Sequence, residues 1–408
     1  MLKGEGAVEP SAREFIEALI QIPELSVTGY QIQSQAVLIF VEVQVRVGQC
    51  AKCGAITREI NQYIERKVRH LPVAGRPCYL IFQEYQFLCR PCRHTWVGPL
   101  DFLSPNQWYT KAYEQYVAER CREHSWQRIS TLENLGYDAV AGIYKRVLRR
   151  KLSAREGLGV RVLGIDEIAQ HKGHRDFICV LSDIERGKVV EVLSSRTKAA
   201  LEAYFDGLLP QQRAAIEVVS IDMWEAYAAV ARMKVPQAAI VVDRFHVMKN
   251  LQEKIQDARR AAQRQLPKAT REELKGLRWL LVRNYDDLDA EDRQKLQRAF
   301  EIWPELATLH GLKEEFRAFY ERKNRRTAIR ALHTWITKVQ QTGHKALLKF
   351  VETVRRWEQQ ILTYFDERIT NGFVEGTNTK IKLIKRRAFG FRNFENFRYR
   401  ILHECGRL

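Results

Sequence analysis

Two short cysteine motifs place the strongest constraint on how this chain can fold. Cys50 and Cys53 form one Cys-x2-Cys motif, in CAKCG, and Cys89 and Cys92 form a second, in CRPC. Each motif turns two thiolates toward one point, so the pair suits a tetrahedral zinc ion that joins two distant segments. Four free thiols would leave the repeated spacing unexplained. We therefore expect a structural Zn2+ in a β-rich N-terminal domain, with two strands spanning residues 54–88.

The other candidate ligands and thiols carry weaker signals. His94 follows the second motif closely and could compete as a zinc ligand. The N-terminus has no apolar signal core, so secretion and a disulfide framework are not expected. The remaining cysteines lie singly and are expected to be buried packing thiols: Cys78, Cys121, Cys179 and Cys405.

The charge of the chain favours a polyanionic partner. The 408 residues include 67 Lys and Arg against 49 Asp and Glu, a formal net charge of +18 at pH 7. Such an excess is typical of proteins that bind nucleic acid. A membrane surface is the other option, but no apolar run approaches the roughly 20 residues of a spanning helix.

The segment between about residues 109 and 151 has the pattern of a helix–turn–helix. Helices are expected in KAYEQYVAERCREH, SWQRISTLENLG and YDAVAGIYKRVLRRKL, with Gly136 at the tight connection before the last. The last helix has an apolar anchor face and a basic remainder, as a DNA-recognition helix requires. A plain helical hairpin with a solvated basic face fits the same pattern. The candidate DNA-binding residues are Lys145, Arg146, Arg149 and Arg150.

The hydrophobic period changes near residue 160, where strand-like runs begin. VRVLGIDEIAQ, DFICVLSDI and KVVEVLSS are expected to form three consecutive strands, and two more strands alternate with helices as far as AAIVVDRFHV. The order β-β-β-α-β-α-β-α predicts a mixed sheet flanked by helices. From about Met248 to Tyr364 the pattern is charged and helical, which predicts an all-α insertion.

Two of the apolar strands each close on an aspartate. Asp166 follows VLGI and Asp222 follows VVSI. Ligands of open α/β sheets bind outside the carboxyl ends of the strands, and two adjacent carboxylates there imply a divalent cation. Glu375 is the candidate for a third acid. A turn former or helix N-cap is the alternative for each Asp, and an acid at a helix N-terminus is the alternative for Glu375.

Further polar residues accompany these acids. Asp243 also ends a strand and could support the site, whereas His246, one helical turn later, is expected to pack or to form hydrogen bonds. Glu167 would face the opposite side of the sheet if its strand continues past Asp166. Thr379, Lys382 and Arg386 share a helical face with Glu375. The residues expected to hold phosphates beside the site are Lys380, Lys382, Lys385, Arg386 and Arg387.

Several segments together resemble a known family. They are CAKCG with CRPC, GIDEIA and GHRDFICVLSD, SIDMWEAY, VVDRFHVMKNL, and TNGFVEGTNTKIKLIKRRAFGFRNFENFRYRIL. Over nearly the whole chain they are similar to the DDE transposases of the bacterial insertion-sequence group called the ISL-three (ISL3) family. The resemblance implies an α/β multidomain protein: a zinc-binding domain (1–106), a helix–turn–helix region (107–156), and an RNase H-like catalytic core (157–248 and 366–408) interrupted by an all-α insertion (249–365).

The resemblance also implies an activity. Such a protein would bind the terminal inverted repeats of its element and catalyse DNA cleavage and strand transfer with two Mg2+ or Mn2+ ions. The catalytic residues, which are also the metal ligands, would be Asp166, Asp222 and Glu375. It would act on double-stranded DNA as a homodimer in the bacterial cytoplasm, associated with the nucleoid. Two alternatives remain: a zinc and helix–turn–helix DNA-binding regulator without cleavage activity, and a nuclease of the same fold that never joins DNA.

Overall fold

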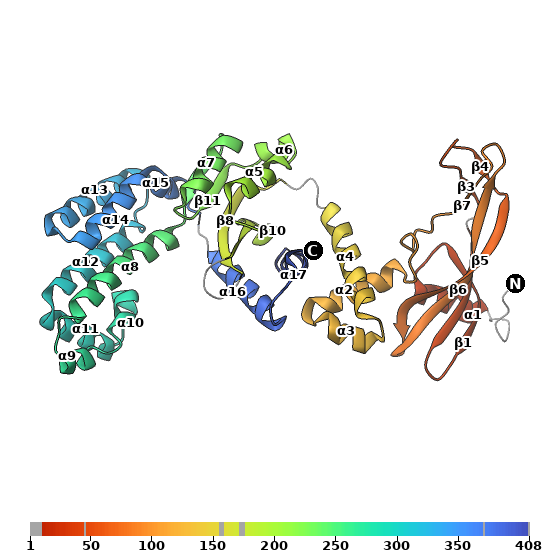
Figure 1. The fold of residues 1–408 in the computed structure, drawn as a ribbon, viewed down its shortest axis with the longest axis horizontal. Helices are drawn as coiled ribbons and strands as arrows, with labels where there is room; N and C mark the ends of the chain where they lie inside the picture. Colours follow the sequence, from red (N-terminus) through yellow and green to blue (C-terminus); the bar gives the residue numbers. More distant parts are fainter. Residues whose placement is uncertain (1–9, 45, 155–158, 171–175, 370–371, 407–408) are drawn as a thin grey trace. The chain divides into compact units, whose positions relative to one another are not determined.

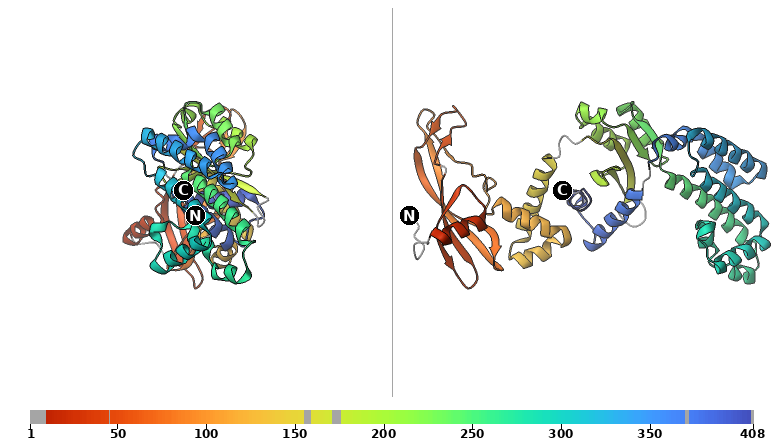
Figure 2. Two further views of the ribbon diagram at one scale, coloured as in Figure 1. Left: turned by 90° about the vertical axis from the view of Figure 1, so that its left-hand side faces the viewer. Right: turned by 180° about the vertical axis from the view of Figure 1, so that it is seen from behind.

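The computed structural model describes residues 10–44, 46–154, 159–170, 176–369 and 372–406. The chain divides into two compact units, Met1–Ala154 and Arg155–Leu408. Each unit is described by itself below, with the elements labelled as in Figure 1 and seen from two further sides in Figure 2.

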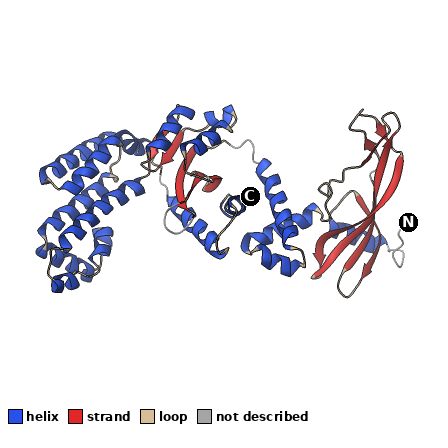
Figure 3. Ribbon diagram, in the orientation of Figure 1, coloured by secondary structure: helices blue, strands red, loops and turns tan. Residues whose placement is uncertain are grey.

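A five-stranded sheet forms the body of the first unit (Figure 3). The strand order is β1-β2-β6-β5, and β7 pairs with β6. A separate pair, β3 with β4, carries the first cysteine motif. The elements are α1 (Pro10–Ile20), β1 (Leu25–Ile32), β2 (Val37–Val43), β3 (Gly48–Gln49), β4 (Ile56–Thr57), β5 (Ile60–Val73), β6 (Arg76–Cys89) and β7 (His94–Val97).

The long hairpin of β5 and β6 closes through two residues with left-handed backbone. Ala74 has φ 49° and Gly75 has φ 74°. Positive φ at both central positions gives the turn a twist that matches the right-handed twist of paired strands. Because each strand is 14 residues long, the hairpin spans the interval between the two cysteine motifs, as the sequence predicts.

Three helices follow the sheet in the same unit: α2 (Lys111–Glu123), α3 (Trp126–Glu133) and α4 (Tyr137–Ser153). The tight connection between α3 and α4 depends on Asn134, not on Gly136 as expected. Asn134 has φ 49°, a left-handed conformation that Asn tolerates better than most residues. Gly136 has φ −61° and ψ 146°, which any residue adopts, and a Cβ there would meet no atom within 4 Å.

The second unit contains the predicted mixed sheet. Its order is β10-β9-β8-β11-β12. β9 is antiparallel to β8 and β10, whereas β11 is parallel to β8 and β12. The strands and the helices between them are β8 (Val162–Ala169), β9 (Phe177–Asp183), β10 (Lys188–Leu193), α5 (Lys198–Asp206), α6 (Pro210–Ala214), β11 (Val218–Ile221), α7 (Glu225–Lys234) and β12 (Ala239–Val242).

Between β12 and the last two helices of the chain, every described element is a helix, as expected for the insertion (Figure 3). They are α8 (Arg244–Gln263), α9 (Lys268–Glu273), α10 (Leu277–Val282), the 3-10 turn η1 (Tyr285–Asp287), α11 (Ala290–Ile302), α12 (Pro304–Phe319), α13 (Arg325–Thr342), α14 (Lys345–Arg356) and α15 (Glu358–Glu367). α8 leaves the sheet directly from β12, and α15 returns to pack against β12. One apolar core therefore runs from the sheet into the insertion.

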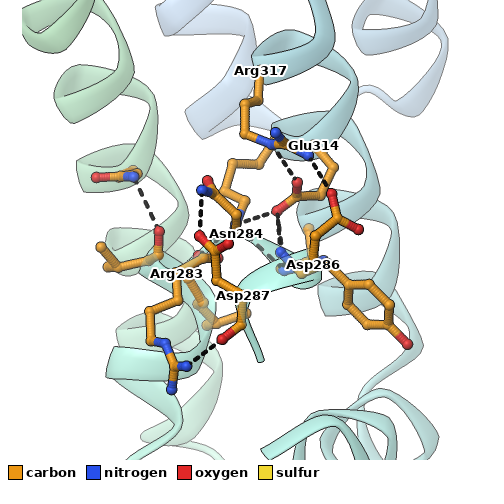
Figure 4. A network of polar contacts seen from close by, with 12 residues as sticks. Arg283, Asn284, Asp286, Asp287, Glu314 and Arg317 are labelled. Carbon is orange, nitrogen blue, oxygen red and sulfur yellow. Dashed lines mark hydrogen bonds and ion pairs between the residues drawn. The ribbon is translucent and has the colours of Figure 1, made fainter. Parts of the chain in front are cut away.

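A buried lysine fixes the chain between α10 and α11. Nζ of Lys313, only 1% exposed, donates to the carbonyl oxygens of Leu281 (3.1 Å) and Arg283 (2.7 Å) and pairs with Glu314 (2.6 Å). Arg317 then joins Glu314 to η1 (Figure 4). A cation suits this place because the last carbonyls of a helix have no partner within the helix. Burial lowers the pKa of Lys313, and Glu314 opposes that shift.

The chain ends in α16 (Gly372–Arg387) and α17 (Phe394–Cys405). α16 packs against β8, and α17 packs against β10. The helix that carries Glu375 therefore lies against the strand that carries Asp166, although more than 200 residues separate the two in sequence.

Candidate active site and zinc site

Strand register brings three aspartates to one level of the mixed sheet. The parallel register between β8 and β11, continued two residues past its last pair, sets Asp222 beside Asp166. The register between β11 and β12, continued by one residue, sets Asp222 beside Asp243. The three carboxyl groups therefore belong to neighbouring positions across β8, β11 and β12.

Asp166 lies within its strand, and the expectation that the strand ends there is wrong. β8 continues to Ala169 because β9 pairs with it over that whole length. Only the pairing with β11 stops before Asp166. Since neighbouring side chains alternate between the faces of a strand, Glu167 faces the other side. Asp166 is thus neither a turn former nor an N-cap.

His246, in the first turn of α8, lies among the three aspartates. Its Nδ1 is 3.3 Å from Oδ2 of Asp222, and its Nε2 is 3.8 Å from Oδ1 of Asp166 and 3.8 Å from Oδ2 of Asp243. Asp243 is also the N-cap of α8, where it accepts a hydrogen bond from the backbone N–H of Phe245 (3.1 Å). The position of His246 one turn beyond a strand-end acid is the sequence signal for this contact.

Asn378 is a site residue that the sequence reasoning missed. Its Nδ2 donates to Oδ2 of Asp166 at 2.5 Å. Its Oδ1 is buried and has no hydrogen-bond partner among the described residues. The sequence signal that could have identified Asn378 is its position: it lies one helical turn after Glu375, on the side of α16 that carries the apolar residues.

Glu375 lies exposed in the first turn of α16. It lines a 460 Å³ pocket together with Asp243 and with Arg317 and Tyr320 of the insertion. Within the described part of the chain, the four motif cysteines are the one group of at least three Cys, His, Asp or Glu residues that is placed to hold a metal ion, and their ligand atoms lie within 4.8 Å of one another. The structure therefore brings Asp166 and Asp222 to one level, but it does not gather them with Glu375 into so tight a group.

A stacked arginine supports the loop that carries Asp222. The guanidinium of Arg196 lies 4.2 Å from the ring centre of Phe177 and 4.3 Å from that of Trp224. It also forms an ion pair with Glu167 at 2.9 Å. Burial raises the pKa of Glu167, and the arginine opposes that rise. Because Trp224 lies two residues after Asp222, this stack fixes the backbone on which the carboxylate depends.

The basic residues of α4 divide into two groups. Arg146 and Arg150 each pair with Glu114 of α2 at 2.8 Å, and the side chain of Glu114 is fully buried. Lys145 makes no ion pair or hydrogen bond within the residues described, and Arg149 is exposed. Arg146 and Arg150 therefore attach α4 to α2, whereas Lys145 and Arg149 lie on its outer side.

Replacing Glu114 by Gln is expected to lower the free energy of unfolding by about 2 kcal/mol, since two charge-assisted hydrogen-bonded pairs to a buried group are weakened. Urea unfolding of the full chain, followed by tryptophan fluorescence, measures the loss. Glu119→Gln is the matched control, because Glu119 lies on the same helix but is 40% exposed in its pair with Lys151. Equal stability of the two variants would contradict a supporting role for Glu114.

The basic residues of α16 divide in the same way. Lys380 donates to the carbonyl oxygen of Glu404 (2.6 Å), and Arg387 pairs with the carboxylate of Glu404. Lys385 donates to two carbonyl oxygens at the end of β8. Lys382 and Arg386 are exposed and make no ion pair within the described ranges. Glu375 and Thr379 are exposed too, in agreement with the predicted stripe.

The four motif cysteines converge as predicted. Each contributes a Sγ that lies within 4.8 Å of the other three, and the Sγ atoms of Cys53 and Cys89 are 3.5 Å apart. The residue after each motif has left-handed backbone, φ 74° at Gly54 and 48° at Arg93, so the two motifs turn alike. His94 stacks against Trp96 and is not part of the cluster. The four single cysteines are buried thiols, as expected.

Comparison with known proteins shows the family. Residues 163–401 match the ISL3 family, described as "Transposase", and residues 46–92 match the zinc finger of transposases IS204, IS1001, IS1096 and IS1165. The transposase for insertion sequence element IS1001 of Bordetella parapertussis is 29% identical over 362 residues, covering 88% of this chain and 89% of the relative. The transposase for IS1557 of Mycobacterium tuberculosis H37Rv is 26% identical over 385 residues, covering 87% and 86%.

Both matches are to transposases: one covers the mixed sheet, and the other covers the four-cysteine site. The class of protein is therefore a transposase. The chain belongs to the ISL3 family of insertion-sequence transposases. The four-cysteine cluster lies within its zinc-finger region, which supports a structural zinc ion. Among the described residues, no helix is both long enough and apolar enough to cross a membrane.

Proposed function

We propose that this transposase binds the terminal inverted repeats of its element and cleaves and joins DNA with Asp166, Asp222 and Glu375 as its catalytic residues. The observation that carries the proposal is the alignment of Asp166 and Asp222 across two parallel strands, with the Glu375 helix packed on β8. The strand order supports an RNase H-like core, interrupted between β12 and α16 by the insertion.

The donor atoms of this site fit Mg2+ or Mn2+, which prefer oxygen ligands. Asp166 and Asp222 offer carboxylate oxygens at neighbouring positions of two adjacent parallel strands. Two such ions, when bound, activate the attacking oxygen and stabilise the leaving oxygen of a phosphodiester. The chain's own contribution is to hold these carboxylates in place and to orient the DNA for in-line displacement.

We propose α3 and α4 as the helix–turn–helix and α4 as the recognition helix. The exposed Tyr137 and Arg149 lie at the ends of a stripe, three turns of helix long, that also includes Ala141 and Lys145. Lys145 and Arg149 are the proposed DNA contacts. Arg146 and Arg150 hold α4 against α2 through their ion pairs with Glu114. The proposed substrate is double-stranded DNA with two element ends, so we propose that the protein acts on it as a homodimer. We also propose that the protein is associated with the bacterial nucleoid.

Incubation with supercoiled DNA that bears both element ends tests the proposed activity. We expect nicked and linear products with Mg2+ or Mn2+ and none in EDTA, with specific binding retained in both conditions. Binding without cleavage in any divalent metal would instead indicate the DNA-binding regulator. Pre-cleaved ends supplied with a target plasmid separate strand transfer from simple hydrolysis, since a nuclease yields no joined product.

Replacing Lys382 and Arg386 together by Met is expected to make DNA binding less dependent on salt. Each phosphate contact contributes about 0.9 to the slope of log affinity against log salt concentration, so the double variant should lose about 1.8. Fluorescence anisotropy at several salt concentrations measures the slope. Lys198→Met is the control, because that lysine is exposed on α5. An unchanged slope in the double variant would remove these two residues from the DNA interface.

A further inference from the structure

Two polar side chains of α16 contact β8 at two separate points. Asn378 donates to the carboxylate of Asp166 at 2.5 Å. Lys385, two helical turns later, donates from Nζ to the carbonyl oxygens of Ala169 (3.0 Å) and Gln170 (3.1 Å). Both lie next to the buried apolar side of the helix, which includes Ile381. The two contacts thus mark one helix–strand interface.

The spacing of the two contacts is the same on the helix and on the strand. Seven residues of α-helix, from Asn378 to Lys385, rise about 10.5 Å. Three to four residues of strand, from Asp166 to Ala169 and Gln170, extend about 10–13 Å. The helix and the strand therefore run in the same direction, and both contacts form together without distortion of either element.

In both contacts the side chain of α16 donates the hydrogen bonds and β8, or the residue just after it, accepts them. The ammonium of Lys385 is directed at two main-chain carbonyl groups, so its place differs from that of the outward-facing Lys382. Asn378 has a different partner, a carboxylate proposed to bind metal. A hydrogen-bond partner behind a metal ligand fixes the orientation of that ligand. Glu375 lies one turn before Asn378, so the same helix sets the positions of two of the three proposed catalytic acids.

We propose that Asn378 and Lys385 form a two-point latch that holds α16 in register with β8 and fixes the carboxylate of Asp166 relative to Glu375. Both are positioning residues. Lys385 is therefore no longer expected to bind phosphate, although its basic sequence context predicts that role. The latch deepens the proposed function and rests on its assignment of Asp166 and Glu375.

The test compares Asn378→Ala and Lys385→Met with Lys382→Met in the full-length protein. Mn2+ affinity without DNA, from the electron paramagnetic resonance of free Mn2+, should fall 10- to 100-fold for Asn378→Ala, the usual effect of removing a partner of a metal ligand. Single-turnover cleavage should fall for Asn378→Ala and Lys385→Met, with recovery in Lys385→Arg, which keeps the cation and its donors. The salt slope of DNA binding should stay at the wild-type value for Lys385→Met and fall by about 0.9 for Lys382→Met.

The possible outcomes separate the latch from the catalytic assignment. Wild-type Mn2+ affinity and cleavage in Asn378→Ala would overturn the latch, as would a salt slope reduced by about 0.9 in Lys385→Met. If Lys385→Met does not fold, Asn378→Ala and Lys385→Arg decide the matter, because hydrogen exchange across 372–387 reports whether α16 stays docked. Cleavage by Asp166→Asn at the wild-type rate would instead show that the catalytic assignment is wrong, whatever the latch variants do.

Discussion

Replacing Asp166 by Asn is expected to lower the rate of DNA cleavage by roughly 10³-fold, the scale of removing one preorganised electrostatic contact from a transition state. Asn has nearly the same shape, and its side-chain oxygen can still accept the hydrogen bond from Asn378. The negative charge is lost, however, and with it the attraction for a divalent ion. Single-turnover nicking of supercoiled DNA with element ends measures the effect.

The affinity of the variant for DNA and its stability have to be measured together with its cleavage rate. Affinity for an element end should remain within a factor of two, because Asp166 is 8% exposed and contributes no cation to a phosphate contact. Glu217→Gln is the matched control, since Glu217 lies just before β11, at the end of that strand opposite to Asp222, and is 62% exposed. Cleavage by the Asp166 variant at a rate close to that of Glu217→Gln would exclude Asp166 as a metal ligand.

The mixed sheet and the insertion could be predicted because their signals are local. Apolar runs such as VVSI and AIVV appear as strands at β11 and β12, and the long charged helical pattern after Met248 contains no competing signal. The end of β8 could not be predicted. Its last residues depend on pairing with β9, so the strand continues past Asp166 although the apolar run stops there.

The roles of the basic residues depend on partners that are distant in sequence. Arg146 and Lys145 are adjacent on α4, yet only Arg146 reaches the buried Glu114, 32 residues earlier. Lys382 and Lys385 lie one turn apart on α16, yet Lys385 reaches carbonyl groups more than 200 residues earlier. A run of positive charge therefore predicts a polyanionic partner for the chain as a whole, but not which cation contacts it. Asn378 was missed for the same reason, because its partner Asp166 lies more than 200 residues earlier in the sequence.

Replacing Cys50 by Ser is expected to remove zinc and to unfold the two cysteine loops without unfolding the sheet beside them. A structural zinc ion supplies folding free energy directly, and three remaining thiolates cannot complete the tetrahedral site. The sheet has its own apolar core, which includes Val68, Leu80 and Phe82. Hydrogen exchange should therefore rise at least roughly tenfold in residues 48–57 and 89–97, while the middle of β5 and β6 stays protected.

Zinc content by atomic emission, measured beside hydrogen exchange, makes this result specific. Wild type should carry one zinc per chain, and Cys50→Ser none. Cys78→Ala is the matched control: Cys78 is fully buried in the same unit but lies outside the cluster, so this variant should lose some stability and keep its zinc. His94→Ala should keep it too, because His94 lies against Trp96. Retention of zinc by Cys50→Ser together with its loss from His94→Ala would replace Cys50 by His94 in the ligand set.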